Sequence, residues 1–295
     1  MFLDKPQGWT SRRAVNEMIR LFTRAGEKRI KAGHAGTLDP LATGMLPVLL
    51  GEATRFSAVG LNADKTYEVT MDLSCQTDTL DAEGETTARF DIRINQKDME
   101  SILPRFTGNL EQIPPAYSAI HVDGQRAHEI ARKGGKVVLA ARPVVIHELR
   151  LINFLFPMVT LRVCCSKGTY IRSLTRDIGT SLGMGGYVTA LRRISTGGWP
   201  EAMMLPFDTV AKQHEACILP LQQWLRHLPT ILLQKVEAQR FVQGQRLQMN
   251  SEIQGEVTVT FEDILLGTGI MKPGMHRMVL HPAQTLPSAQ RRLLS

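Results

Sequence analysis

The segment Gly33–Gly44 reads Gly-His-Ala-Gly-Thr-Leu-Asp-Pro-Leu-Ala-Thr-Gly and precedes the apolar run Met45–Leu50. Because glycine and proline interrupt regular structure, the sequence predicts a shaped loop here, not the interior of a helix or strand. The apolar run is typical of a buried strand, which would fix this loop to a rigid sheet. Such a scaffold would present the carboxylate of Asp39. An aspartate beside a proline is also a common turn residue, so this stretch alone leaves its role open.

The composition indicates a globular protein with one large core and a smaller appended module. The chain has 295 residues, of which 43% are hydrophobic and 21% charged, which is ordinary for such proteins. It contains no run of about eighteen apolar residues, so we expect no membrane span. The four cysteines lack metal-ligand spacing, which predicts neither a zinc site nor a disulfide framework. We therefore expect a cytoplasmic protein.

The net charge of +7 is distributed unevenly along the chain. Residues 12–31 carry seven Lys/Arg against two Glu, and 124–150 and 162–193 are similarly basic, whereas 62–116 holds eleven Asp/Glu and five Lys/Arg. Each cluster alone is typical of a solvated helix face. Together they predict one basic surface that binds a polyanion through phosphate contacts.

The periodicity of the sequence predicts an α+β protein without regular βαβ units. A helix is expected after Thr10, which would cap it. The other expected elements are strands at 45–50, 66–73, 88–94, 144–156, 159–165 and 187–194, and helices at 96–107 and 170–182. Four prolines between 200 and 229 mark a change of composition. After them we expect a helix at 236–242, strands at 256–261 and 277–281 with a glycine-rich turn between them, and a frayed tail from about Pro282.

A second informative segment is Cys165–Leu174, in which a strand ends and a helix begins with Tyr170 and Arg172 in its first turn. Helix starts favour anions, so an arginine there needs a carboxylate or phosphate partner. An exposed arginine is one interpretation. The other pairs Arg172 with Asp39 and thereby favours the ionised carboxylate.

Several blocks of the chain, in order from residue 3 to residue 194, closely resemble the TruB family of tRNA pseudouridine-55 synthases. They are residues 3–8 (Leu-Asp-Lys-Pro-Gln-Gly), 33–44, 51–55, 65–67, 113–119 (Ile-Pro-Pro-Ala-Tyr-Ser-Ala), 124–127 and 166–172. Beyond residue 230 the likeness is weaker and resembles the PUA-type RNA-binding module of the family. The resemblance implies a pseudouridine-synthase-like catalytic domain over residues 1–228, with a mixed or antiparallel central sheet flanked by helices. It also implies a small, mostly β, PUA-like RNA-binding domain over 229–295.

The resemblance implies that uridine 55 in the T-loop of tRNA is flipped out, detached at its N1–C1′ bond and rejoined through C5. This isomerisation is redox-neutral, so no cofactor is expected, and the chain lacks dinucleotide and P-loop fingerprints. Asp39 matches the essential carboxylate; whether it attacks C1′ or removes the 2′ proton stays open. Tyr67 and Arg172 match further catalytic positions. Substrate contacts are implied for His34, Tyr170, Leu191, Arg55 and Asp81.

The implied partner is the T-stem-loop of tRNA, with no membrane, no obligate protein partner and a monomeric chain. His128 departs from the family, which usually has tyrosine there, so altered RNA contacts are expected with the chemistry intact. Two other functions stay open. One is a tRNA-binding folding factor in which chemistry is incidental. The other is a small-molecule lyase that uses Asp39, which explains the segregated charge poorly.

Overall fold

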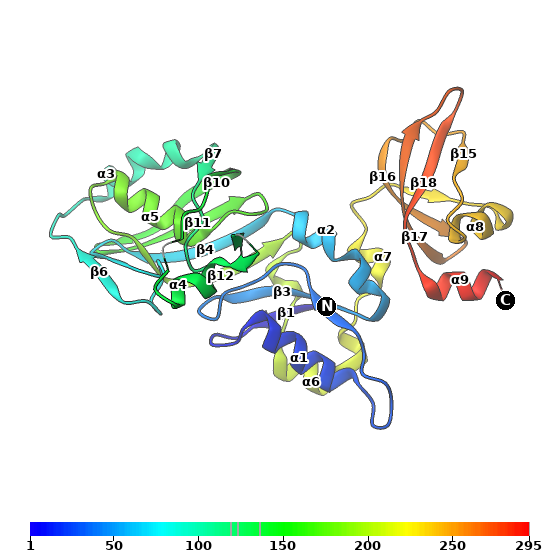
Figure 1. Cartoon of the computed structure of the whole chain (residues 1–295), viewed down its shortest axis with the longest axis horizontal. Helices are drawn as coiled ribbons and strands as arrows, with labels where there is room; N and C mark the ends of the chain where they lie inside the picture. The colour runs from blue at the N-terminus through cyan, green and yellow to red at the C-terminus, as the bar shows by residue number, and fades with distance from the viewer. Residues whose placement is uncertain (119, 123, 136, 295) are drawn as a thin grey trace.

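The computed structural model describes residues 1–118, 120–122, 124–135 and 137–294. Within them, nine strands form one mixed sheet in the order β13-β1-β3-β12-β4-β11-β10-β7, with β2 paired to β3 (Figure 1). Their bounds are β1 (Phe2–Lys5), β2 (Ala32–His34), β3 (Thr43–Leu50), β4 (Lys65–Asp72), β7 (Gly108–Gln112), β10 (Arg142–Leu155), β11 (Met158–Cys165), β12 (Tyr187–Thr196) and β13 (Met204–Pro206). The predicted α+β class and central mixed sheet are confirmed.

Helices border this sheet. Figure 1 shows α1 and α6 beside β1, and α3 and α5 near β7 and β10. The helices are α1 (Ser11–Phe22), α2 (Ser57–Asn62), α3 (Gln96–Ile102), α4 (Ala127–Arg132), α5 (Ile171–Ser181), α6 (Phe207–Gln213) and α7 (Leu221–Trp224), with 3-10 turns at Gly51–Phe56, Leu103–Phe106, Glu201–Met203 and His214–Cys217. The predicted cap is confirmed, because the Thr10 side chain accepts a hydrogen bond from the Arg13 N–H at the start of α1.

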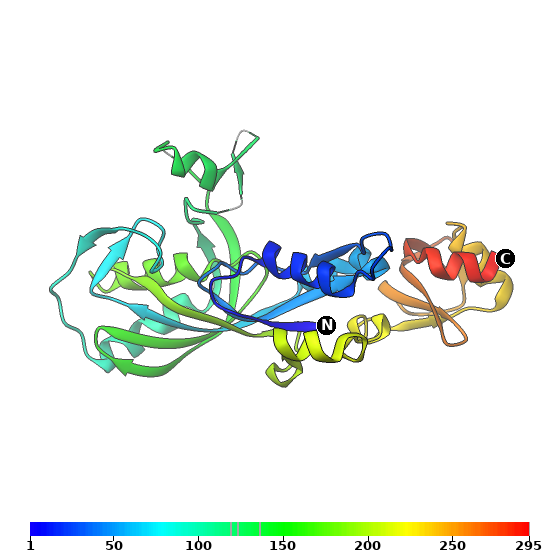
Figure 2. The ribbon, with the colours of Figure 1, turned by 90° about the horizontal axis from the view of Figure 1, so that it is seen from below.

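Two small hairpins lie outside the large sheet. β5 (Cys75–Thr77) pairs with β6 (Thr86–Arg89), and β8 (His121–Val122) pairs with β9 (Gln125–Arg126) just before α4. Figure 2 shows α4 standing away from the body of the sheet. The side chain of His128, on α4, lies outside what the structure describes, so the expectation attached to it stays a prediction.

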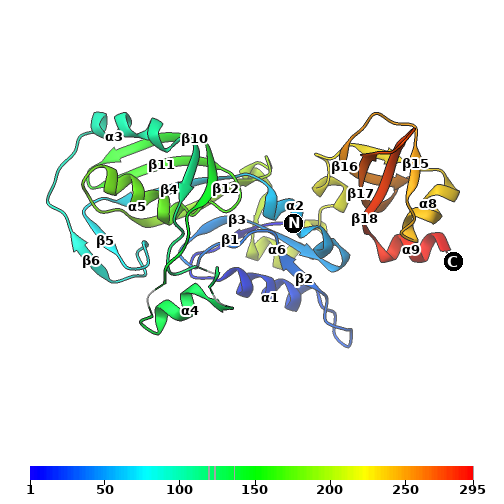
Figure 3. The same cartoon turned by 45° about the horizontal axis from the view of Figure 1, so that its top comes forward.

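The C-terminal part forms a separate five-stranded sheet in the order β14-β16-β17-β18-β15. Figure 3 shows this unit at one end of the molecule, beyond α2. Its elements are β14 (Thr230–Leu232), α8 (Lys235–Val242), β15 (Leu247–Met249), β16 (Gly255–Phe261), β17 (Ile264–Pro273), β18 (Met278–Thr285) and α9 (Pro287–Leu294).

Several local expectations were wrong. The supposed glycine-rich turn after 261 is the ten-residue strand β17, and the supposed frayed tail is the end of β18 followed by α9. Strand β6 ends at Arg89, not 94. The helix expected over 96–107 ends at Ile102 and continues as a 3-10 turn that contains Pro104. The ends of the Gly33–Gly44 segment also join strands β2 and β3.

One carboxylate joins the two sheet units. Glu52, just after β3, accepts hydrogen bonds from the Ser288 backbone N–H at 3.0 Å and from its hydroxyl at 2.6 Å, and Arg291 approaches it at 3.4 Å. This carboxylate therefore sits at the N-terminus of α9, where the exposed N–H groups and the helix dipole favour negative charge. Apolar side chains from both units pack in a single buried cluster beside it.

Candidate active site

The loop that carries Asp39 is held through its backbone carbonyls. The Gly36 and Thr37 oxygens accept hydrogen bonds from the Arg193 guanidinium at 3.1 and 3.3 Å, and the Leu38 oxygen accepts one from the Ser11 hydroxyl at 3.0 Å. The Asp39 oxygen bonds the Ala42 N–H, and the Pro40 oxygen bonds the Gly8 N–H. Five successive carbonyls thus accept hydrogen bonds, four of them from groups on α1, β12 and the N-terminal segment and that of Asp39 from within the loop, which makes the loop a rigid support for Asp39.

Gly44 lets this loop enter the sheet. A Cβ atom at Gly44 would lie 2.3 Å from the backbone oxygen of Arg193, and its φ angle is +95°. Strand β3 pairs there in parallel with β12, Gly44 opposite Arg193. Only glycine tolerates both the backbone conformation and the close approach, so this position of the motif is explained by packing.

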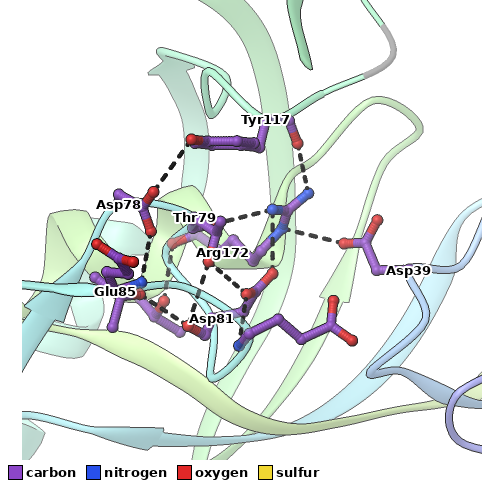
Figure 4. A network of polar contacts seen from close by, with 10 residues as sticks. Asp39, Asp78, Thr79, Asp81, Glu85, Tyr117 and Arg172 are labelled. Carbon is purple, nitrogen blue, oxygen red and sulfur yellow. Dashed lines mark hydrogen bonds and ion pairs between the residues drawn. The ribbon is translucent and has the colours of Figure 1, made fainter. Parts of the chain in front are cut away.

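Arg172 connects the Asp39 loop with the acidic loop after β5 (Figure 4). Its Nε lies 3.1 Å from Oδ2 of Asp39, and its Nη1 lies 3.2 Å from Oδ2 of Asp81. It also donates to the backbone oxygens of Thr79 and Tyr117, both at 2.9 Å. The guanidinium fork therefore has four fixed acceptors, and the ion pair predicted between Asp39 and Arg172 is present.

The two carboxylates beside Arg172 differ in access. The Asp39 side chain is 39% exposed, whereas those of Asp81 and Arg172 are 5% and 8% exposed. Oδ1 of Asp81 accepts from the Thr79 hydroxyl at 2.6 Å and from the Glu83 N–H at 3.1 Å. Asp39 can reach a ligand from solvent, while Oδ2 of Asp81 is engaged by Arg172 and Oδ1 by Thr79 and Glu83.

Tyr67 and Leu191 lie on the sheet next to this ion pair. Tyr67 on β4 pairs with Arg193 on β12, and Val69 pairs with Leu191. Directly paired residues and residues two apart share a face, so Tyr67, Leu191 and Arg193 point to the same side of the sheet. Burial raises the pKa of the Tyr67 phenol, and the positive charge of Arg193 partly opposes that rise.

His34 lies five residues before Asp39, and Tyr170 lies two residues before Arg172. His34 ends β2, and its Nδ1 is buried without a hydrogen-bond partner among the described residues. Burial lowers the pKa of His34, and the charges of Arg193 and Arg12 lower it further, which favours the neutral ring. The backbone N–H of Tyr170, the residue before α5, donates to the Gln112 side chain at 2.7 Å.

Arg55 does not join the other residues. It is exposed in the 3-10 turn that follows β3, whereas Asp39 precedes β3. An eight-residue strand spans about 25 Å, so the strand separates Arg55 from the ion pair. A contact between Arg55 and the reacting uridine is therefore not supported by the geometry, although a contact with a more distant part of a large ligand stays a prediction.

Sequence reasoning missed two buried cations and one carboxylate. Arg193 and Lys5 are 1% and 0% exposed, and Nζ of Lys5 approaches the Trp9 and Pro40 oxygens at 2.7 and 3.4 Å. Burial lowers the pKa of Lys5 to about 8, with the charge of Asp39 opposing the fall. Burial raises the pKa of Glu83, and the charges of Asp81 and Asp39 add to the rise. A sequence signal existed only for Lys5, which stands in the block 3–8.

The described residues contain no group of three His, Cys, Asp or Glu side chains placed to hold a metal ion. No helix within the described ranges is long and apolar enough to cross a membrane. The site is thus an accessible carboxylate beside a buried guanidinium, with a phenol and an aliphatic side chain lying alongside. Such a centre suits general base or nucleophilic chemistry at carbon.

Comparison with known proteins identifies relatives over the whole chain. A model described as "TruB family pseudouridylate synthase (N terminal domain)" matches residues 23–171, and one described as "tRNA pseudouridylate synthase B C-terminal domain" matches 172–228. A protein of Azoarcus sp. (strain BH72) named tRNA pseudouridine synthase B is 40% identical, covering 94% of this chain and 92% of its own. Its namesake from Dechloromonas aromatica (strain RCB) is 41% identical, covering 98% and 95%.

Solved structures share the architecture at low identity. A chain from "Crystal Structure of a Cbf5-Nop10-Gar1 Complex" superposes with a TM-score of 0.74 at 23% identity, covering 97% of this chain and 84% of that one. A chain from the "archaeal box H/ACA sRNP Nop10-Cbf5 complex" gives 0.72 at 23%, covering 97% and 85%. At this identity the likeness shows the fold alone.

Proposed function

Because this chain belongs to the TruB family of pseudouridylate synthases, we propose that it converts uridine 55 in the T-loop of tRNA into pseudouridine. The observation that carries the proposal is the Asp39–Arg172 ion pair, whose carboxylate is 39% exposed on a loop fixed by five carbonyl contacts. A carboxylate placed so is available to the sugar of an extruded nucleoside.

The reaction is an isomerisation in which atoms are conserved. The N1–C1′ bond breaks, a C5–C1′ bond forms, C5 loses a proton and N1 gains one. Asp39 acts on the ribose, either by attack at C1′ or by removal of the 2′ proton. Both routes require the ionised carboxylate, and the guanidinium of Arg172 stabilises that form at 3.1 Å.

The other residues take supporting roles in this proposal. Tyr67 and Leu191, on one face of the sheet, form the wall against which the detached uracil turns. His34 and Tyr170 lie at the edges, where a ring can replace the stacking that a flipped base loses. Asp81 holds Arg172, so we assign it a positioning role and not a substrate contact.

The RNA is held by the basic segments. In residues 12–31, 124–150 and 162–193, the Lys and Arg side chains that are neither buried nor paired with a carboxylate contact the phosphates of the T-stem-loop. This excludes, for example, Arg172, Arg176, Arg192 and Arg193. The five-stranded unit within 229–295 acts as a PUA-like RNA-binding domain. We further propose that the protein acts in the cytoplasm as a monomer, without an obligate protein partner and without a cofactor.

The test uses the purified full-length protein and unmodified tRNA transcripts. Chemical mapping of pseudouridine should show one modified site, uridine 55, in the wild-type transcript and none in a matched transcript with cytidine at that position. An isolated T-stem-loop should also be modified. Modification at another position, or of free uridine only, would contradict the proposal.

A further inference from the structure

Arg193 is a buried guanidinium whose charge is met by the backbone of the Asp39 loop. Nε donates to the Met45 oxygen at 2.6 Å, and the two Nη atoms donate to the Thr37 and Gly36 oxygens. These acceptors lie on both sides of Asp39 in the chain. Among the described residues, Arg193 forms no ion pair with a carboxylate, although it is only 1% exposed.

Burying the Arg193 guanidinium without a carboxylate partner among the described residues costs free energy of folding. Removing a charge from water costs several kcal/mol or more, and carbonyl dipoles return less than a carboxylate partner would. An apolar side chain would fill the same place between β3 and β12 with less loss of hydration. A buried arginine at this place is therefore explained better by its fixing of the loop carbonyls than by a gain in folding stability.

The same side chain is the cross-strand neighbour of a second residue of the site. Arg193 lies opposite Tyr67 across the β12–β4 pair, on the same face of the sheet, and its charge opposes the rise that burial causes in the pKa of the Tyr67 phenol. One rigid, planar group therefore joins the loop of Asp39 to the wall formed by Tyr67. We propose that Arg193 is a positioning residue, which sets the distance between the Asp39 carboxylate and the Tyr67 ring across which the uracil turns.

This inference rests on the proposed function. It requires the planar shape of the arginine side chain at position 193 as well as its positive charge. A displacement of about 1 Å at a reacting group can cost on the order of a hundredfold in rate. Lysine keeps the positive charge but offers a compact ammonium in place of a planar fork, so it cannot serve carbonyls that diverge around a guanidinium. Arg193→Lys should therefore disturb geometry while it preserves charge.

The chain offers a matched control. Arg192, the neighbouring residue of β12, faces the other side of the sheet and binds Asp4 through two 2.9 Å contacts. Arg192→Lys also replaces a fork by an ammonium on the same strand, but it touches neither the Asp39 loop nor Tyr67. The experiment compares both variants with the wild type on the T-stem-loop, measuring the single-turnover rate at saturating RNA, the RNA Kd and the fraction of binding-competent protein.

We expect Arg193→Lys to lower the single-turnover rate by about 10- to 100-fold with the RNA Kd changed by less than about threefold. Arg192→Lys should leave both unchanged. In a double-mutant cycle, Tyr67→Phe should lower the rate less in the Arg193→Lys background than in the wild type, because the shared arrangement is already lost. A wild-type rate for Arg193→Lys, or a loss confined to the binding-competent fraction, would overturn the inference.

If Arg193→Lys does not fold, a second variant, Gly36→Ala, tests the role of Arg193. Gly36 has a φ angle of +128°, a backbone conformation that L side chains rarely adopt, so Gly36→Ala strains the loop at the carbonyl that accepts a hydrogen bond from Arg193. It should reproduce the fall in rate at unchanged RNA Kd, and full activity would count against the inference. If the wild type itself makes no pseudouridine, the proposed function fails, whereas normal rates in these variants overturn the role of Arg193 alone.

Discussion

Nε of Arg172 lies 3.1 Å from Oδ2 of Asp39 and joins the loop before β3 to the first turn of α5. The guanidinium is itself fixed by Asp81 and by the backbone oxygens of Thr79 and Tyr117. A buried fork with four acceptors can hold one carboxylate in a defined orientation, as bidentate and charge-assisted hydrogen bonds do elsewhere.

Arg172→Lys should lower the rate of pseudouridine formation by at least about a hundredfold, because an ammonium cannot bridge Asp39, Asp81 and two carbonyls at once. The RNA Kd should stay within about threefold, since Arg172 is 8% exposed and contributes little to the RNA-binding surface. Single-turnover rates and filter binding measure the two quantities. Arg176→Lys, one turn further along α5, is the control and should leave both unchanged.

Arg12 offers a test of the basic surface. It is exposed on α1, and its charge lowers the pKa of His34, which places it near the site. Arg12→Gln should weaken RNA binding and reduce the slope of log Kd against log salt by about 1, with the single-turnover rate at saturating RNA unchanged. A changed rate at saturation with an unaltered salt slope would show that Arg12 does not act through phosphates.

Lys5 predicts a pH dependence of stability. Burial lowers its pKa from 10.5 to about 8 in the folded protein, so between these pH values the unfolded chain binds more protons than the folded one. Stability then rises with pH in this window. Urea unfolding should show the wild type gaining stability relative to Lys5→Met from pH 8 to pH 10, by up to about 3 kcal/mol. A constant or shrinking difference would contradict the assignment. Burial also lowers the pKa of Lys65 to about 8. Because Lys65 is present in both the wild type and Lys5→Met, its contribution cancels in the difference between them.

The sequence predicted the elements that are marked locally by hydrophobic periodicity, by a preceding glycine or by a capping residue. Alternating residues over 66–73 and the apolar run after Gly44 became β4 and β3, and Thr10 caps α1 as expected. In the C-terminal unit, the glycines at 267 and 269 suggested a turn, but they lie within β17. There a Cβ atom at either position would collide with β18, so close strand approach and not turning explains them.

The site was partly predictable for a similar reason. Asp39 and Arg172 stand in unusual local contexts, a glycine-rich loop and the start of a helix. Arg193 gives no such signal, because in the sequence it is one basic residue of an alternating strand, and only the pairing of β12 with β3 and β4 places it under the loop. Asp81 was predicted to touch the substrate, yet its burial and its contacts with Arg172 and Thr79 indicate a supporting position.

Glu52 provides a test of how the two sheet units are joined. Glu52→Ala removes the acceptor of the Ser288 N–H and hydroxyl at the start of α9. We expect a loss of about 1–2 kcal/mol of stability and faster proteolysis of the segment between α7 and β14, with the rate on an isolated T-stem-loop unchanged. Urea unfolding and limited proteolysis measure the first two effects. Glu256→Ala, on an exposed part of β16, serves as the control. Equal proteolysis of both variants would show that Glu52 does not hold the units together.

The most direct test of the account replaces Asp39 by asparagine, which keeps the size of the side chain and removes its charge. Pseudouridine formation in the T-stem-loop, followed under single-turnover conditions, should fall by at least about a thousandfold, while the RNA Kd stays within about threefold of the wild type. An Asp39→Asn protein that converts uridine at the wild-type rate would contradict the central claim, and any biological effect of the protein on tRNA would then have to come from binding alone.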